Sequence, residues 1–127
     1  MLEEWEEFQA GPTPPRAERL HVSLNGKGQI LLNKNAVEAL GTPEAVILMF
    51  EKRNSKIGIR PANAHLSNAF PLKPRPSAHS RMIHASPFCR NYGIRVTGTV
   101  AFNNIDIDRE GMMTLDLAKT SRVSRVR

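Results

Sequence analysis

The chain has 127 residues, of which 40% are hydrophobic, and this is enough for one domain of ordinary size or two very small intertwined ones. Its one cysteine, Cys89, excludes a disulfide within the chain and is typical of a reducing compartment. No apolar run approaches the roughly 20 residues that a membrane helix needs, so we expect a cytoplasmic protein without a membrane partner.

The formal net charge of +6 is unevenly distributed. The first nine residues contain four glutamates and neither Lys nor Arg, which leaves 18 basic and eight acidic residues in the rest of the chain. A body this basic is compatible with nucleic acid, because each Lys or Arg that neutralises a phosphate releases a counterion. Many small proteins are basic without binding nucleic acid, so the charge alone leaves the partner open.

Residues 1–19 are predicted to form an acidic arm and a proline-rich linker. Leu2, Trp5 and Phe8 recur at every third residue, which predicts a short helix with one apolar stripe. Because two helical turns are unstable alone, the stripe is expected to dock on this domain, on a second copy of the chain or on another protein. A further alternative is an acidic flap over a basic surface.

Residues 20–62 have the pattern of short strands and one short helix separated by turn signals. Gly26 and Gly28 predict a tight turn, Asn33 is a good helix N-cap, and Gly41 suits the left-handed end of a helix. The expected elements are strands at His21–Asn25 and Gln29–Leu32, a helix at Lys34–Leu40, a strand at Val46–Glu51 and a returning strand with Ile57 and Ile59.

This order of elements, with GQILL at 28–32, AVEALG at 36–41 and IGIRP at 57–61, resembles the AbrB/SpoVT-like swapped-hairpin family, which includes MazE and the tandem MraZ-like members. The resemblance covers about a third of the chain. It implies a DNA-binding or antitoxin-like fold, in which basic residues of the loop between the first two strands and of the helix face reach DNA. At the matching positions this chain has Lys27 and Lys34.

The second half of the chain repeats this pattern at an offset of 52, which places Gly93 on Gly41. Residues 81–119 are accordingly predicted to form a second βαββ-like half, whereas the proline-rich residues 63–80 are predicted to form an extended basic linker. The expected elements are a strand at Arg81–Ala85, a helix that is capped by Ser86 and ends at Gly93, and strands at Thr97–Ile107 and Met113–Leu117. A chance similarity of short elements is the alternative.

Together these features predict a mainly β protein with short helices (α+β), in which two βαββ-like pseudo-repeats form an AbrB-like swapped-hairpin β-barrel. Neither half alone can bury its apolar faces, which is the physical reason to expect the two halves to pair. Residues 120–127 are predicted to be a basic tail.

No constellation of residues indicates catalysis, so we expect a protein that is not an enzyme and has no cofactor. Cys89 falls on the apolar face of its predicted helix, where a buried structural thiol is expected. His65, His79 and His84 lack metal-ligand spacing. The acidic side chains of residues 106–110 surround an arginine in a predicted hairpin turn, so no metal site is predicted there either.

The preferred function is DNA binding, as in a transcriptional regulator that contacts duplex DNA through basic loop and helix positions. A duplex is favoured because no aromatic residues interleave with the basic ones to stack single-stranded bases. The predicted nucleic-acid-binding residues are Lys27, Asn33, Lys34, Lys52, Arg53, Arg81, Arg90, Arg122 and Arg125, with Arg95 as an additional candidate.

The alternative function is that of a non-enzymatic interaction subunit, antitoxin-like or a complex-assembly adaptor, which grips another protein through Leu2, Trp5 and Phe8. The two functions differ in the surface they require, which is either the basic positions or the acidic-aromatic arm. The sequence leaves open whether two chains associate into a homodimer.

Overall fold

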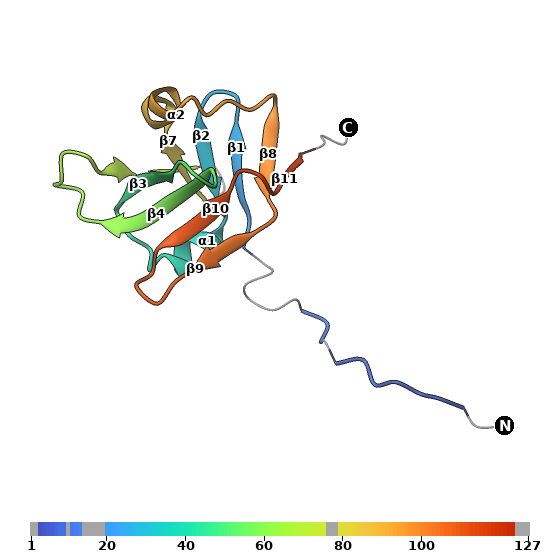
Figure 1. Ribbon diagram of the computed structural model, residues 1–127. Coiled ribbons are helices and arrows are strands. Elements are labelled where there is room, and N and C mark those ends of the chain that lie inside the picture. Colours follow the sequence, from blue (N-terminus) through green and yellow to red (C-terminus); the bar gives the residue numbers. More distant parts are fainter. Residues whose placement is uncertain (1–2, 10, 14–19, 76–78, 124–127) are drawn as a thin grey trace.

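The computed structural model describes residues 3–9, 11–13, 20–75 and 79–123 (Figure 1). In these residues the protein is mainly β, with two antiparallel sheets and two short helices, as the sequence predicts. The first elements are β1 (Val22–Asn25), β2 (Gln29–Leu32), α1 (Lys34–Ala39), β3 (Ala45–Glu51) and β4 (Lys56–Ala62). The remaining elements are β5 (Phe70–Pro71), β6 (Lys73–Pro74), β7 (Arg81–His84), α2 (Ser86–Tyr92), β8 (Thr99–Phe102), β9 (Ile105–Ile107), β10 (Met113–Asp116) and β11 (Thr120–Arg122).

Each sheet takes strands from both halves of the chain. The first sheet has the order β11-β8-β1-β2-β7-β6, and the second has the order β5-β3-β4-β10-β9. β2 pairs with β7 so that Ile30 lies opposite Ile83 and Leu31 lies opposite Met82. In the second sheet the halves meet where β4 pairs with β10. Neither sheet closes on itself within the described residues.

The hydrophobic core lies between the two sheets and joins both halves in one cluster. Alternate residues of the strands point into it, because successive side chains of a strand face opposite sides of the sheet. The fully buried side chains include Val22, Leu24, Leu32, Ile30 and Ile83 from the first sheet and Val46, Ile57, Ile59, Met113 and Leu115 from the second. Burying a side chain of this size contributes about 1.5 to 3 kcal/mol, so the contact between the sheets is the main source of stability.

Helix α1 forms where the sequence predicts it, and Asn33 is its N-cap. The Asn33 side-chain oxygen accepts hydrogen bonds from the Ala36 N–H at 2.9 Å and from the His21 N–H at 3.1 Å. The same amide therefore caps the helix and holds the chain at the entrance to β1. The helix is followed by Gly41 at φ 85°, a conformation that glycine adopts without strain.

Helix α2 also forms as predicted and ends at Gly93 in the left-handed conformation, but the predicted cap at Ser86 is wrong. The N-cap is Ala85, which offers no side-chain hydrogen bond, and Ser86 is already helical. The chain turns one residue early because the Ala85 N–H donates to the Gly28 carbonyl at 2.9 Å, which anchors the end of β7 beside the β1–β2 turn. Neither α1 nor α2, the helices of the described residues, has the length and apolarity that crossing a membrane requires.

The single strand predicted over residues 97–107 is wrong, because the chain leaves one sheet for the other at Asn103. β8 belongs to the first sheet and β9 to the second. The return path changes sheets in the same way between β10 and β11, and the Asn103 N–H donates to the Lys119 carbonyl at 2.8 Å where the two crossings meet. The start of the predicted basic tail is thus an edge strand, β11, paired with β8.

The predicted extended segment at 63–80 contains two very short strands at sheet edges. β5 pairs with β3, and β6 pairs with β7. The prolines at 71 and 74 are compatible with these positions, because an edge strand leaves some of its backbone N–H positions without a ladder partner. Residues 76–78 lie outside the described part of the chain.

The helix predicted for the N-terminal arm is wrong in the described residues 3–9, which have no regular secondary structure. Trp5 and Phe8 are 86% and 81% exposed, so the aromatic stripe packs on nothing in the described chain. Without a docking surface, two turns cannot offset the cost of ordering the backbone. Leu2 and the linker residues 14–19 lie outside the described residues.

Candidate nucleic-acid interface

The β1–β2 turn lies directly against the start of α2, at one end of the molecule (Figure 1). Gly28 has φ +78°, and a Cβ at this position would come within 2.7 Å of the Ser86 Cα. The loop after α2 approaches the same turn, since a Cβ on Gly26 would lie 3.5 Å from the Val96 carbonyl oxygen. Glycine is therefore required at 28 for close backbone approach as well as for its φ.

The Asn25 side chain organises this turn. Its oxygen accepts hydrogen bonds from the Lys27 N–H at 3.0 Å and the Gln29 N–H at 3.1 Å, while its NH₂ donates to the Gln29 side-chain oxygen at 2.8 Å. This arrangement holds the backbone of Lys27 in one conformation and leaves its side chain exposed. The sequence analysis missed Asn25, although an Asn immediately before a glycine-rich turn is a known turn former.

A groove of about 670 Å³ is bordered by the β1–β2 turn, by α2 and by the loop that follows α2. We call it the turn–helix groove. It is lined by Leu24, Asn25, Gly26, Lys27, Gly28, Ser86, Cys89, Arg90, Gly93, Ile94, Arg95 and Val96. The lining thus contains three cations, from the turn, the helix and the loop, and neither Asp nor Glu.

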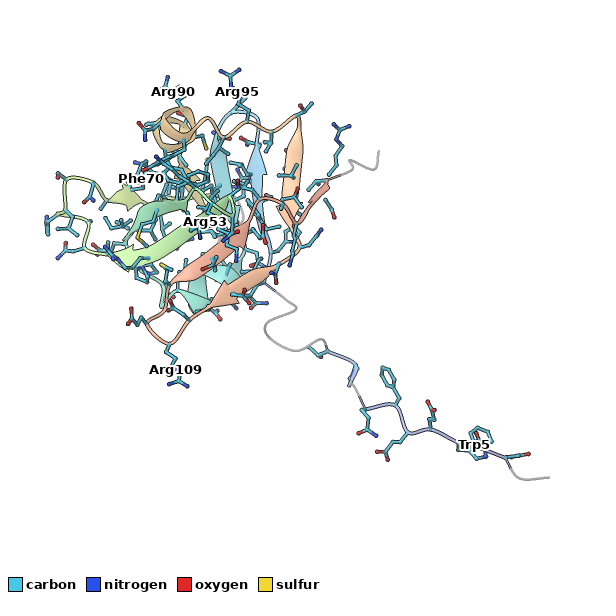
Figure 2. The ribbon with its side chains drawn as sticks, in the orientation of Figure 1. Trp5, Arg53, Phe70, Arg90, Arg95 and Arg109 are labelled. Atoms are coloured by element: carbon cyan, nitrogen blue, oxygen red, sulfur yellow. The ribbon has the colours of Figure 1, made fainter. Side chains whose placement is uncertain are left out.

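The three cations are exposed and available to an anionic partner. Lys27, Arg90 and Arg95 are all exposed, and within the described residues none of their side chains forms an ion pair. Figure 2 shows Arg90 and Arg95 projecting from the same end of the molecule. The groove therefore combines an apolar floor, including Ile94, with a positively charged rim.

Cys89 lines the floor of the groove and is buried, as predicted. Burial raises the pKa of the Cys89 thiol above its ordinary value, because the charged thiolate is poorly solvated there. The thiolate is the nucleophilic form of cysteine, so this environment suppresses its reactivity. The residue has the properties of a packing side chain.

Lys34 and Arg81 lie at the other end of the β2–β7 pair, so the structure does not bring Lys27 and Lys34 together. Lys27 precedes β2 and Lys34 follows it, and Arg81 lies opposite Leu32 at the far end of the ladder. Lys34 Nζ is 3.9 Å from Glu38 Oε1, so these two side chains form an ion pair along α1. The Arg81 guanidinium donates to the Ser80 carbonyl at 3.0 Å and is half-buried.

The other predicted residues are scattered. Lys52 and Arg53 are exposed on the β3–β4 turn, where the Glu51 carboxylate accepts from the Arg53 N–H at 3.1 Å. Arg122 is exposed on the edge strand β11, and Arg125 lies outside the described residues. The side-chain oxygen of Asn33 is engaged in capping α1.

In the described part of the chain no three His, Cys, Asp or Glu residues are grouped as metal ligands would be. The chain finds no match among protein-family models, among curated proteins or among solved structures.

Proposed function

We propose that this protein binds duplex DNA through the turn–helix groove and acts as a non-enzymatic DNA-binding protein of the transcription-regulator kind. The observation that carries the proposal is the convergence of Lys27, Arg90 and Arg95 on one groove whose lining has no acidic residue. Lys27 is far in the sequence from Arg90 and Arg95, so its place beside them is a property of the fold and not of local charge clustering.

Phosphate is the best-matched ligand for such a rim. Lys and Arg neutralise phosphates and position a protein on the duplex, while backbone and amide groups add hydrogen bonds. A single strand is a poorer match, because the groove lining has no Phe, Tyr or Trp on which bases would stack. The side chains of Asn25 and Gln29 stand beside Lys27, but each is already hydrogen-bonded to the other.

The strand registers support the proposal that the chain is an internal duplication with an AbrB-like swapped-hairpin arrangement. At the offset of 52, Ile30 corresponds to Met82 and Leu31 corresponds to Ile83. In the β2–β7 ladder Leu31 lies opposite Met82 and Ile30 opposite Ile83, so the offset exchanges these two pairs with each other. This register is the one expected if a two-fold axis relates the two halves and passes between the Ile30–Ile83 pair and the Leu31–Met82 pair.

The test is binding of the full chain to labelled random duplex across 50 to 200 mM salt. Three phosphate contacts predict that log K falls with log salt with a slope of about −2.7. Lys27→Glu with Arg90→Glu is expected to abolish binding at the higher salt without unfolding the protein, because two attractive contacts become repulsive. Fluorescence anisotropy measures the binding, and circular dichroism checks the fold.

Arg109→Glu is the matched control, because it changes the net charge by as much as Arg90→Glu. Arg109 is exposed in the β9–β10 turn, at the opposite end of the molecule from Arg90 (Figure 2). Equal losses in the two single variants would show that only net charge matters and would contradict a localised site. No binding at low salt would contradict the proposed function itself.

A second candidate function is favoured by the exposure of Trp5 and Phe8, which is unusual for two large aromatic side chains so close together. The Trp5 indole N–H donates to Glu3 at 3.1 Å, so its polar atom is satisfied and its ring is free for a partner. An acidic segment with two aromatic anchors suits a protein partner with a basic-rimmed apolar groove.

Trp5→Ala is expected to weaken such a partner by about 30-fold or more, as truncation of a buried aromatic anchor typically does. Pulldown with wild-type and Trp5→Ala protein makes the comparison, with Gln9→Ala as the control from the same segment. Trp5 is the only tryptophan of the chain, so a blue shift of its fluorescence reports engagement directly. Retention of every captured protein by Trp5→Ala would exclude the arm as the anchor, whether or not DNA binding is observed.

A further inference from the structure

The β2–β7 pair has two ends that correspond to each other. At one end the β1–β2 turn meets α2, and at the other the chain enters α1 (Figure 1). The offset of 52 places α1 on α2 and Gly41 on Gly93, and both of these glycines have positive φ after their helices. The turn–helix groove therefore has a counterpart position at the α1 end.

The charges of the two ends differ at each of the three positions that make the groove basic. The counterpart of Arg90 is Glu38, that of Lys27 is His79, and that of Arg95 is Pro43. Glu38 brings a negative charge to the helix face that carries Arg90 at the other end, and its carboxylate lies 3.9 Å from Lys34 Nζ. The one cation on α1 is thus partly neutralised.

We infer that the protein binds DNA from one end only, so that one chain holds one duplex in an asymmetric position and needs no palindromic site. The inference rests on the proposed function. Two-fold related strands normally present two equivalent surfaces, which is why two-fold symmetric proteins read symmetric sites. Here β2 corresponds to β7 and α1 to α2, but a carboxylate at Glu38 repels phosphate where Arg90 attracts it.

The first experiment measures stoichiometry with a short duplex of about one helical turn, roughly 11 base pairs. The full chain is titrated at a concentration well above Kd and followed by sedimentation. We expect one duplex per chain. Two duplexes per wild-type chain would overturn the inference.

Two alanine variants locate the bound end. Arg90→Ala is expected to weaken binding and to reduce the salt slope by about 1, as loss of one phosphate contact does. Lys34→Ala is expected to leave both quantities unchanged. An equal loss in Lys34→Ala would show that both ends contact DNA and would overturn the inference.

The third variant supplies the missing charges. Glu38→Arg combined with His79→Lys places cations at two of the three counterpart positions and is expected to raise the stoichiometry to two short duplexes per chain. Glu38→Gln is the control, because it removes the carboxylate without adding a cation. A folded double variant that still binds one duplex would contradict the claim that charge separates the two ends.

The failure of this inference is distinguishable from failure of the proposed function. If wild-type protein binds no duplex at low salt, DNA binding itself is wrong. If it binds duplex with two sites per chain, or with equal dependence on Lys34 and Arg90, DNA binding holds and one-sidedness is wrong.

Discussion

Replacing Gly28 by alanine is expected to lower the free energy of unfolding by about 2 to 5 kcal/mol, through left-handed backbone strain and a steric clash. The new Cβ would lie 2.7 Å from the Ser86 Cα and 2.9 Å from its Cβ, and the first of these is a backbone atom that cannot rotate away. The β1–β2 turn and α2 must then separate, so the turn–helix groove is expected to lose its geometry. Urea unfolding followed by circular dichroism measures the loss.

Gly41→Ala separates the two causes. Gly41 has φ +85°, close to the value at Gly28, but a Cβ there would have no atom within 4 Å. It is expected to cost only the backbone strain, about 1 to 2 kcal/mol. If the two variants lose the same stability, then the contact between Gly28 and Ser86 contributes nothing and the close approach of turn and helix is wrong.

Replacing Ile30 by alanine is the second change with a large expected effect, a loss of about 2 to 5 kcal/mol. Ile30 is completely buried and lies between Leu24 of β1 and Ile83 of β7 in the first sheet. Its truncation leaves a cavity at the place where the two halves of the chain meet. Since small domains have only about 5 to 15 kcal/mol of stability, the midpoint in urea is expected to fall markedly.

Leu31→Ala provides the comparison from the same strand. Leu31 is only half-buried and faces the opposite side of the first sheet, so we expect a loss of about 1 kcal/mol, typical of a point substitution. Equal m-values for the variants would show that the denatured states are comparable. A greater loss for Leu31 than for Ile30 would mean that the faces of β2 are assigned the wrong way round.

Local signals predicted the elements of the fold well where the physical cause is itself local. The Asn33 side chain accepts from the Ala36 N–H three residues away, and Gly41 and Gly93 reach a conformation closed to most other residues. In the strands with Ile57 and Ile59 and with Met113 and Leu115, the large apolar side chains recur at every second position, and all four are buried.

The predictions of secondary structure were wrong where tertiary contacts determine the local conformation. Asn103 and Asn104 interrupt the apolar pattern of residues 97–107 where the chain changes sheets, but these two residues do not indicate that the next strand joins the other sheet. Trp5 and Phe8 have helical spacing, yet the helix needs a docking surface that the described chain does not provide. Ser86 is a good capping residue, but the hydrogen bond from Ala85 to Gly28 starts the helix before it.

The residues of the candidate site could be predicted from the sequence, but which of them come together in space could not. Lys27, Arg90 and Arg95 were identifiable as basic residues next to turns and a helix, whereas their convergence depends on the packing of the β1–β2 turn on α2. Lys27 and Lys34 were predicted together because they stand at the loop and helix positions that the family resemblance implies. However, the four residues of β2 span about 13 Å, so Lys27 and Lys34 lie at opposite ends of this strand.

The position of β1 between β2 and β8 has a consequence for synthesis on the ribosome. β1 and β2 emerge together and can form a hairpin, but the other edge of β1 waits for β8, since Leu24 lies opposite Val100. At about 5 to 20 residues per second, several seconds pass before that partner is made. A two-stranded hairpin is marginal alone, so the nascent chain exposes an apolar, unpaired strand during this interval. A translational pause before Thr99 is therefore expected to increase its dependence on chaperones.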